Sequence, residues 1–149
     1  MRRHRFASAL LLATAAAALV ACSSDSDDKG GDGGAAATSA APATGYTVLT
    51  PQEGKDLLES GTALTLIDVR TPTEFASGHI EGAVNSDLEG GAFSQYIADL
   101  DKDATYVVYC HSGRRAALAA DAMVAAGFTH VYDLGGIVDW QAAGYPLVS

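Results

Sequence analysis

Residues 105–109, Thr-Tyr-Val-Val-Tyr, are the feature that most constrains how this 149-residue chain can fold. The run is β-branched and aromatic throughout, which favours a strand. Its apolar residues do not alternate with charged ones, so we expect the strand to be buried on both faces. Strands of this kind belong to parallel sheets, and parallel neighbours need long crossover connections that are usually helical. The rest of the chain must therefore supply alternating strands and helices.

The flanking sequence does alternate in this way. We predict further strands at 46–49, 63–69, 83–85 and 130–132. We predict helices at 51–59, 72–77, 93–100, 114–126 and 136–143. Each of the first two helices starts within a Thr-Pro-x-Glu sequence. This sequence supplies an N-cap, a proline at the first helical position and a capping-box glutamate. The order predicts an α/β fold of three layers, with a central, mostly parallel sheet and helices on both faces.

The first 21 residues predict a signal peptide. Arg2, Arg3 and Arg5 precede an uncharged, mostly apolar stretch over 6–21, which is shorter than the about 20 apolar residues of a membrane span. Its end, Leu19-Val20-Ala21-Cys22, resembles a bacterial lipobox. That resemblance implies cleavage before Cys22, lipid on Cys22 and an extracytoplasmic protein anchored to the cell membrane. The alternative is a secreted protein with a free Cys22. We favour the general secretory route over twin-arginine export.

Residues 22–44 are mainly Ser, Asp, Gly, Ala and Thr, and they contain too few large apolar side chains to bury a core. We predict a disordered tether there and one folded domain over 45–149. The chain has nine Lys and Arg against 18 Asp and Glu, and the predicted signal holds three of the nine. Such an acidic protein repels nucleic acid and anionic head groups. We expect no nucleic-acid partner, membrane contact through the lipid alone, and a monomer.

Cys110 is the candidate nucleophile. If Cys22 carries lipid, Cys110 is left without an intramolecular partner, and an unpaired thiol in an exported protein is a candidate reactive group. It directly follows the predicted strand 105–109, and ligands of open α/β sheets bind at the carboxyl ends of strands. The following helix N-terminus and two arginines favour the thiolate and an anionic ligand. The residues predicted to bind that anion are His111, Ser112, Gly113, Arg114 and Arg115.

Several motifs follow one another along 46–149. They are Asp68-Val69-Arg70 with Glu74-Phe75, Gly78-His79-Ile80-Glu81-Gly82-Ala83-Val84-Asn85, Cys110-x-x-Gly113-x-Arg115, Gly135-Gly136-Ile137-Val138-Asp139-Trp140 and Gly144-Tyr145-Pro146. Together, and in this order, they resemble the rhodanese (thiosulfate sulfurtransferase) family, which has Pro in place of Glu81. The resemblance spans nearly all of 46–149.

The resemblance implies a sulfurtransferase in which Cys110 takes sulfane sulfur from a donor such as thiosulfate and becomes a persulfide. A thiol or cyanide acceptor then removes the sulfur. Loop N–H groups and Arg115 would stabilise the anionic states, and Arg114 would help to attract the donor. No metal and no organic cofactor is implied. His111 is either a base or a loop residue that shapes access.

Four residues outside the loop also need an interpretation. Asp68 and Arg70 either support the site or form a structural ion pair, and the ion pair is favoured. His79 is expected to be structural and Trp140 to lie in the core.

Three other functions are alternatives. A Cys-dependent phosphatase or arsenate reductase is disfavoured, because dual-specificity phosphatases that resemble this fold have five residues between Cys and Arg, whereas four separate Cys110 from Arg115 and position 116 is Ala. A non-catalytic rhodanese-like module at the cell envelope would bind a partner or sense oxidants. A persulfide carrier or sulfide detoxifier would share the chemistry and differ only in donor and acceptor.

Overall fold

The computed structural model describes residues 45–149. The predicted signal peptide (1–21), the predicted lipidation site Cys22 and the predicted tether (22–44) lie outside the described residues, so these remain predictions. Within the described part of the chain, none of the helices is long and apolar enough to cross a membrane.

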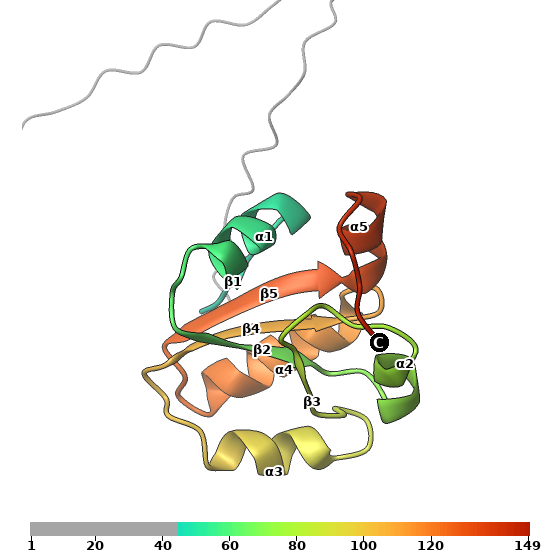
Figure 1. Cartoon of the computed structure of the whole chain (residues 1–149). Coiled ribbons are helices and arrows are strands. Elements are labelled where there is room, and N and C mark those ends of the chain that lie inside the picture. Colours follow the sequence, from blue (N-terminus) through green and yellow to red (C-terminus); the bar gives the residue numbers. More distant parts are fainter. Residues whose placement is uncertain (1–44) are drawn as a thin grey trace, which may run out of the picture. The chain divides into compact units, whose positions relative to one another are not determined.

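A five-stranded sheet forms the centre of the described residues (Figure 1). Its strands pair in the order β1-β5-β4-β2-β3, and every pairing is parallel. The strands are β1 (Thr47–Val48), β2 (Leu64–Asp68), β3 (Val84–Asn85), β4 (Thr105–Cys110) and β5 (His130–Gly136). The middle position belongs to β4, the strand that the 105–109 run predicts. Its residues 106–110 are all buried, because helices cover both faces of the sheet.

Five helices complete the layers. They are α1 (Pro51–Glu59), α2 (Pro72–Ala76), α3 (Ala92–Ala98), α4 (Arg114–Ala125) and α5 (Ile137–Ala142). In Figure 1, α1 and α5 lie on one face of the sheet and α3 and α4 on the other, while α2 lies near the carboxyl edge. The arrangement confirms the predicted α/β fold of three layers.

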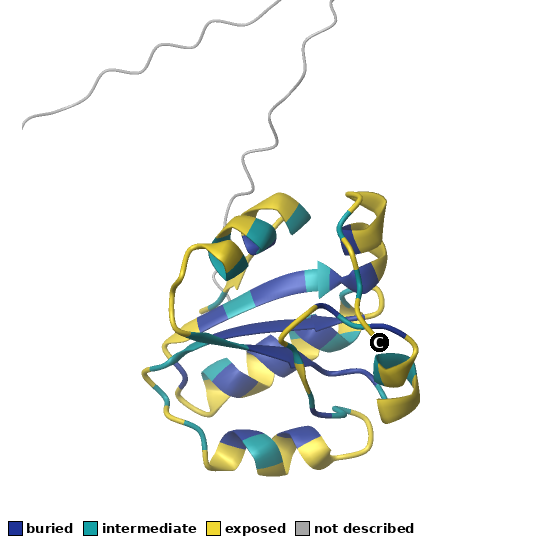
Figure 2. Ribbon diagram, in the orientation of Figure 1, coloured by how far each residue is buried: buried dark blue, intermediate teal, exposed yellow. Residues whose placement is uncertain are grey.

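Two apolar cores lie on the two faces of the sheet (Figure 2). Alternate residues of β4 serve each core, because successive side chains of a strand point to opposite faces. Val108 and Cys110 belong to the core that contains Phe93 of α3 and Met123 of α4. Tyr109 belongs to the other core, where Trp140 of α5 lies. The side chain of Cys110 therefore lies on the face of the sheet that α3 and α4 cover.

Local sequence signals set the helix starts. Thr50 and Glu53 form a complete capping box at α1, and Thr71 and Glu74 form another at α2. Both helices begin at the proline that the sequence places after the threonine. These contacts lie within four residues, so the local sequence is enough to predict them.

The strand β5 is longer than its predicted span of 130–132. It continues through Asp133, a buried residue whose carboxylate accepts a hydrogen bond from the N–H of Gly135 at 2.8 Å. Burial raises the pKa of Asp133. A charged residue inside a strand is unfavourable unless it has such a partner, and the sequence pattern alone does not reveal the partner.

Candidate active site

Cys110 lies at the carboxyl end of β4, directly before the loop that leads into α4. Its residue is 1% exposed. The N–H of Gly113 donates to Cys110 Sγ at 3.1 Å, so the loop curls back over the sulfur. The N-terminus of α4 directly follows, and backbone N–H groups at such a position suit the binding of an anionic group.

Glycines allow the loop to lie against β5 and the start of α5. Gly113 has a φ of +91°, a conformation that side chains disfavour. Gly136 pairs with Cys110 in the sheet, and a Cβ on Gly136 would come within 2.8 Å of the carbonyl oxygen of His111. That carbonyl also accepts a hydrogen bond from the N–H of Val138 at 3.3 Å. The loop is therefore fixed by backbone packing.

Arg115 is bound to a carboxylate that lies 41 residues earlier in the chain. Its Nη1 donates to Glu74 Oε2 at 2.9 Å and its Nη2 to Glu74 Oε1 at 2.7 Å. The hydrogen bonds from Arg115 lower the pKa of Glu74 to about 2. The same pairing raises the pKa of Arg115 above its usual range. This bidentate contact ties the first turn of α4 to α2.

Glu89 adds a second carboxylate to the loop arginines. Its Oε1 accepts from Arg114 Nη2 at 3.1 Å, and its Oε2 from Arg115 Nη1 at 3.4 Å. The Arg114 side chain is 71% exposed and the Glu89 side chain 53%. Both arginines of the predicted anion site are thus paired with carboxylates.

Asp68 and Arg70 form a buried ion pair at the carboxyl end of β2, the neighbour of β4. Arg70 Nη2 donates to Asp68 Oδ2 at 2.6 Å and to the carbonyl oxygen of Gly78 at 2.7 Å. Asp68 is 0% exposed and Arg70 4%. Burial raises the pKa of the adjacent Tyr109 hydroxyl, which accepts a hydrogen bond from the N–H of Ile80. The pair joins β2 to the turn before β3.

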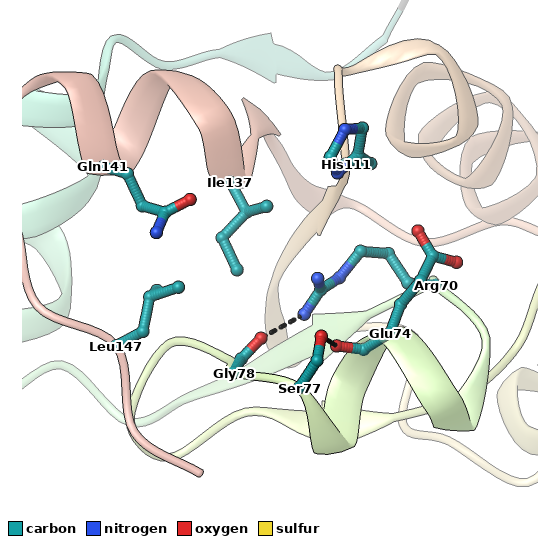
Figure 3. Close-up of a pocket in the computed structure, with 8 residues that line it drawn as sticks. All are labelled: Arg70, Glu74, Ser77, Gly78, His111, Ile137, Gln141 and Leu147. Carbon is teal, nitrogen blue, oxygen red and sulfur yellow. Dashed lines mark hydrogen bonds between the residues drawn. The ribbon is translucent and has the colours of Figure 1, made fainter.

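A pocket of about 300 Å³ lies beside the loop (Figure 3). The guanidinium of Arg70 points into it, and Ile137, Gln141 and Leu147 face that group from the opposite side. Cys110 is absent from the lining, whereas its neighbour His111 is present. The lining residues are Arg70, Glu74, Ser77, Gly78, His111, Ile137, Gln141 and Leu147.

Sequence reasoning did not single out Ser77, Gln141 or Leu147 for the site. They come from three separate segments, and only the tertiary fold brings them together. Glu74 belongs to a motif and to the capping box of α2, and neither pattern predicts its pairing with Arg115. The one available signal was the motif match at Glu74.

His79 and Trp140 do not line this pocket, but they contact the residues on either side of Leu147, which does. The His79 ring stacks on Phe75 with centroids 3.8 Å apart, and its backbone N–H donates to the carbonyl of Val148 at 2.8 Å. Trp140 is 5% exposed and its Nε1 donates to the carbonyl of Pro146 at 3.2 Å. Both residues fix the segment that carries Leu147. Over residues 45–149, no group of three His, Cys, Asp or Glu is placed to hold a metal ion.

The chain is similar to known sulfurtransferases. It is 42% identical over 111 residues to the probable adenylyltransferase/sulfurtransferase MoeZ of Mycobacterium tuberculosis, covering 72% of this chain and 28% of that relative. It is 35% identical over 99 residues to the thiosulfate sulfurtransferase GlpE of Pseudomonas aeruginosa, covering 66% of this chain and 86% of GlpE. The chain therefore spans about a quarter of the length of MoeZ and most of GlpE.

A similar solved structure and a matching family model point to the same family as these relatives. The polysulfide-sulfur transferase homodimer of Wolinella succinogenes superposes with a TM-score of 0.58 at 29% identity, covering 70% of this chain and 79% of that one. The family model for the rhodanese-like domain matches residues 50–143, a range that runs from the cap of α1 to the end of α5 and contains the Cys110 loop. The chain belongs to the rhodanese-like domain family.

Proposed function

We propose that the chain is a sulfurtransferase that moves sulfane sulfur from a donor such as thiosulfate to a thiophilic acceptor through a persulfide on Cys110. The observation that carries the proposal is the N–H of Gly113 donating to Cys110 Sγ at the N-terminus of α4. The names of GlpE and of the Wolinella protein support the reaction class.

The reaction has two displacement steps. The Cys110 thiolate attacks the outer sulfur of thiosulfate, an S–S bond forms, and the S–S bond of the donor breaks so that sulfite leaves with the electron pair. Cys110 then carries one additional sulfur and one negative charge. A thiolate or cyanide attacks that terminal sulfur and leaves with it, which restores the Cys110 thiolate. Neither step needs an external oxidant or reductant.

The loop supplies the electrostatic support for these steps. Negative charge moves between Cys110 Sγ and the sulfur bound to it, close to the N–H groups at the start of α4. Such groups stabilise an anion without reorganising during the reaction. In this proposal Arg115 acts through Glu74 to hold the loop in place, and His111 shapes the mouth of the pocket.

Mass spectrometry after treatment with thiosulfate tests the proposal. We expect Cys110 to gain the mass of one sulfur atom and Cys110→Ser to lose both the adduct and turnover while keeping the fold. Cys22→Ala is the matched control, because it removes the second cysteine and should keep the adduct. Turnover that survives in Cys110→Ser would exclude covalent catalysis at this residue.

A second candidate is a non-catalytic module that binds a partner or senses oxidants. The 1% exposure of Cys110 and its absence from the pocket lining favour it, since a donor must reach the sulfur through a narrow approach. Both forms of this role predict no sulfur adduct with any donor. A partner-binding module, which the burial of Cys110 favours, also predicts slow oxidation of Cys110 by hydrogen peroxide, whereas an oxidant sensor predicts rapid oxidation.

We also propose that the protein is anchored outside the cytoplasm by lipid on Cys22. The basic residues, apolar stretch and lipobox-like sequence of 1–22 support this proposal, and several acyl chains hold a protein at a membrane more firmly than one. Cys22→Ala should shift the protein from the membrane fraction to the soluble fraction, and Cys110→Ala should leave it in place. A Cys22→Ala protein that still sediments with membranes would exclude the anchor.

A further inference from the structure

The arginines near the Cys110 loop carry no uncompensated positive charge. Residues 45–149 contain three arginines, and each makes an ion pair: Arg70 with Asp68, Arg114 with Glu89, and Arg115 with Glu74 and Glu89. The lysines in the same part of the chain do not change this balance, since Lys55 is bound to Glu59 and Lys102 donates to the carbonyl of Ile97. A dianion that binds near the Cys110 loop would have to compete with these carboxylates for the arginines.

The pocket beside the loop has the composition of a site for an organic group. Its volume of about 300 Å³ lies at the lower end of the range for small-molecule sites. Ile137 and Leu147 give it apolar wall, and the exposed amide of Gln141 and hydroxyl of Ser77 give it neutral polar groups. Its two charged residues, Arg70 and Glu74, each have a partner of opposite sign outside the lining.

We propose that this pocket binds the organic part of a small persulfide or thiol of low net charge, and that Glu89 disfavours thiosulfate by occupying Arg114 and Arg115. The inference rests on the proposed sulfurtransferase function and narrows its substrate class. Thiosulfate has no carbon to place against Ile137 and Leu147. Its two negative charges would meet Glu74 in the pocket lining and loop arginines that Glu89 already binds. An organic persulfide uses the apolar wall and brings less charge.

The transfer from such a donor balances in atoms and charge. The Cys110 thiolate attacks the outer sulfur of R–S–SH, the S–S bond of the donor breaks, and R–S⁻ leaves with the electron pair. Cys110 then carries –S–SH, and the leaving thiolate takes a proton from water. The same pocket serves the reverse step, in which a thiol of the same kind accepts the sulfur.

The test compares two donors on the full chain by the rate at which Cys110 gains sulfur. The donors are thiosulfate and 2-hydroxyethyl persulfide, whose organic group is neutral. We expect the wild type to have the higher kcat/KM with the persulfide. Glu89→Gln should raise the ratio of the thiosulfate rate to the persulfide rate by roughly threefold, the scale of a largely exposed ion pair. The matched control is Asp99→Asn, which removes one negative charge from the exposed end of α3 and should leave the ratio unchanged.

A second variant tests the apolar wall. Leu147→Ala should lower the rate with 2-hydroxyethyl persulfide more than the rate with thiosulfate, because only the organic donor contacts that side chain. A wild type that prefers thiosulfate, or a donor ratio that does not move in Glu89→Gln and Leu147→Ala, overturns the inference and leaves the sulfurtransferase function standing. Absence of a Cys110 adduct with both donors overturns the function and the inference together.

Discussion

Two carboxylate–arginine pairs near the Cys110 loop contain the same chemical groups in opposite settings. Asp68 and Arg70 lie two residues apart on one chain segment and are almost completely buried. Glu74 and Arg115 are 41 residues apart, and the glutamate side chain is 33% exposed. The first pair joins the end of β2 to the turn at Gly78, while the second joins the loop helix α4 to α2.

The two pairs differ in burial, and we expect them to differ in their roles for the same reason. A buried charge that loses its partner cannot be solvated by water, so the inner pair is costly to break. The outer pair is partly open to water, since the Glu74 side chain is 33% exposed and the Arg115 side chain 11%, so it should cost less to break than the inner pair. The inner pair should therefore govern stability of the whole fold, and the outer pair should govern the position of the loop.

Asp68→Asn should have the largest effect. It leaves the Arg70 guanidinium buried without a counter-charge, and we expect a loss of about 3 to 5 kcal/mol in the free energy of unfolding. Denaturant unfolding monitored by circular dichroism measures it. The control is Asp68→Asn combined with Arg70→Met, which removes both charges and should recover part of the loss. A single variant as stable as wild type would remove the distinction between the pairs.

Glu74→Gln should have a smaller effect of a different kind. Glutamine keeps the capping box of α2, which accepts either residue, so the variant isolates the ion pair to Arg115. We expect a loss of about 1 kcal/mol, faster amide exchange over residues 111–113 and slower sulfur transfer. Exchange is read by mass spectrometry on the loop peptide. A loss as large as that of Asp68→Asn would show that both pairs support the fold equally.

The outer pair should also give a weak dependence of stability on pH. The pKa of Glu74 falls from 4.5 to about 2 on folding, chiefly through the hydrogen bonds from Arg115. Its contribution is thus fully present above pH 4.5 and is lost as the pH falls through about 2. The stability difference between wild type and Glu74→Gln should shrink over that window in urea unfolding at stepped pH. A constant difference would contradict the assignment.

Arg114→Gln should have the smallest effect. The Arg114 side chain is 71% exposed and its contact with Glu89 is open to water, so we expect a change within about 0.5 kcal/mol in the free energy of unfolding. Thermal unfolding is sufficient to measure it. A drop approaching that of Glu74→Gln would mean that the Glu89 contacts, and not Glu74 alone, hold the loop.

The sequence predicts best what depends on neighbours in the chain. The threonine caps and following prolines of α1 and α2 set the helix starts within one residue, and the unbroken 105–109 run predicts the central buried strand. The placement of Cys110 at a carboxyl strand end follows from the same pattern. These features need no knowledge of distant contacts.

Features that depend on distant contacts were not predictable in the same way. The extension of β5 through Asp133 to Gly136 depends on its pairing with β1 and β4. The pairing of Glu74 with Arg115 depends on how α2 docks beside α4. The pocket walls at Ser77 and Leu147 depend on the bridge between His79 and Val148. In each case, contacts between segments far apart in the sequence determine the surroundings of the residue.

The close approach of Gly136 to the carbonyl of His111 has an evolutionary consequence. The space on the outer side of the loop is occupied by β5 and α5, so an extra residue inserted after Cys110 would collide with the start of α5. Lengthening the loop requires a second change that moves that helix. The length of the Cys110 loop is therefore protected against single insertions by the strand and the helix that face it.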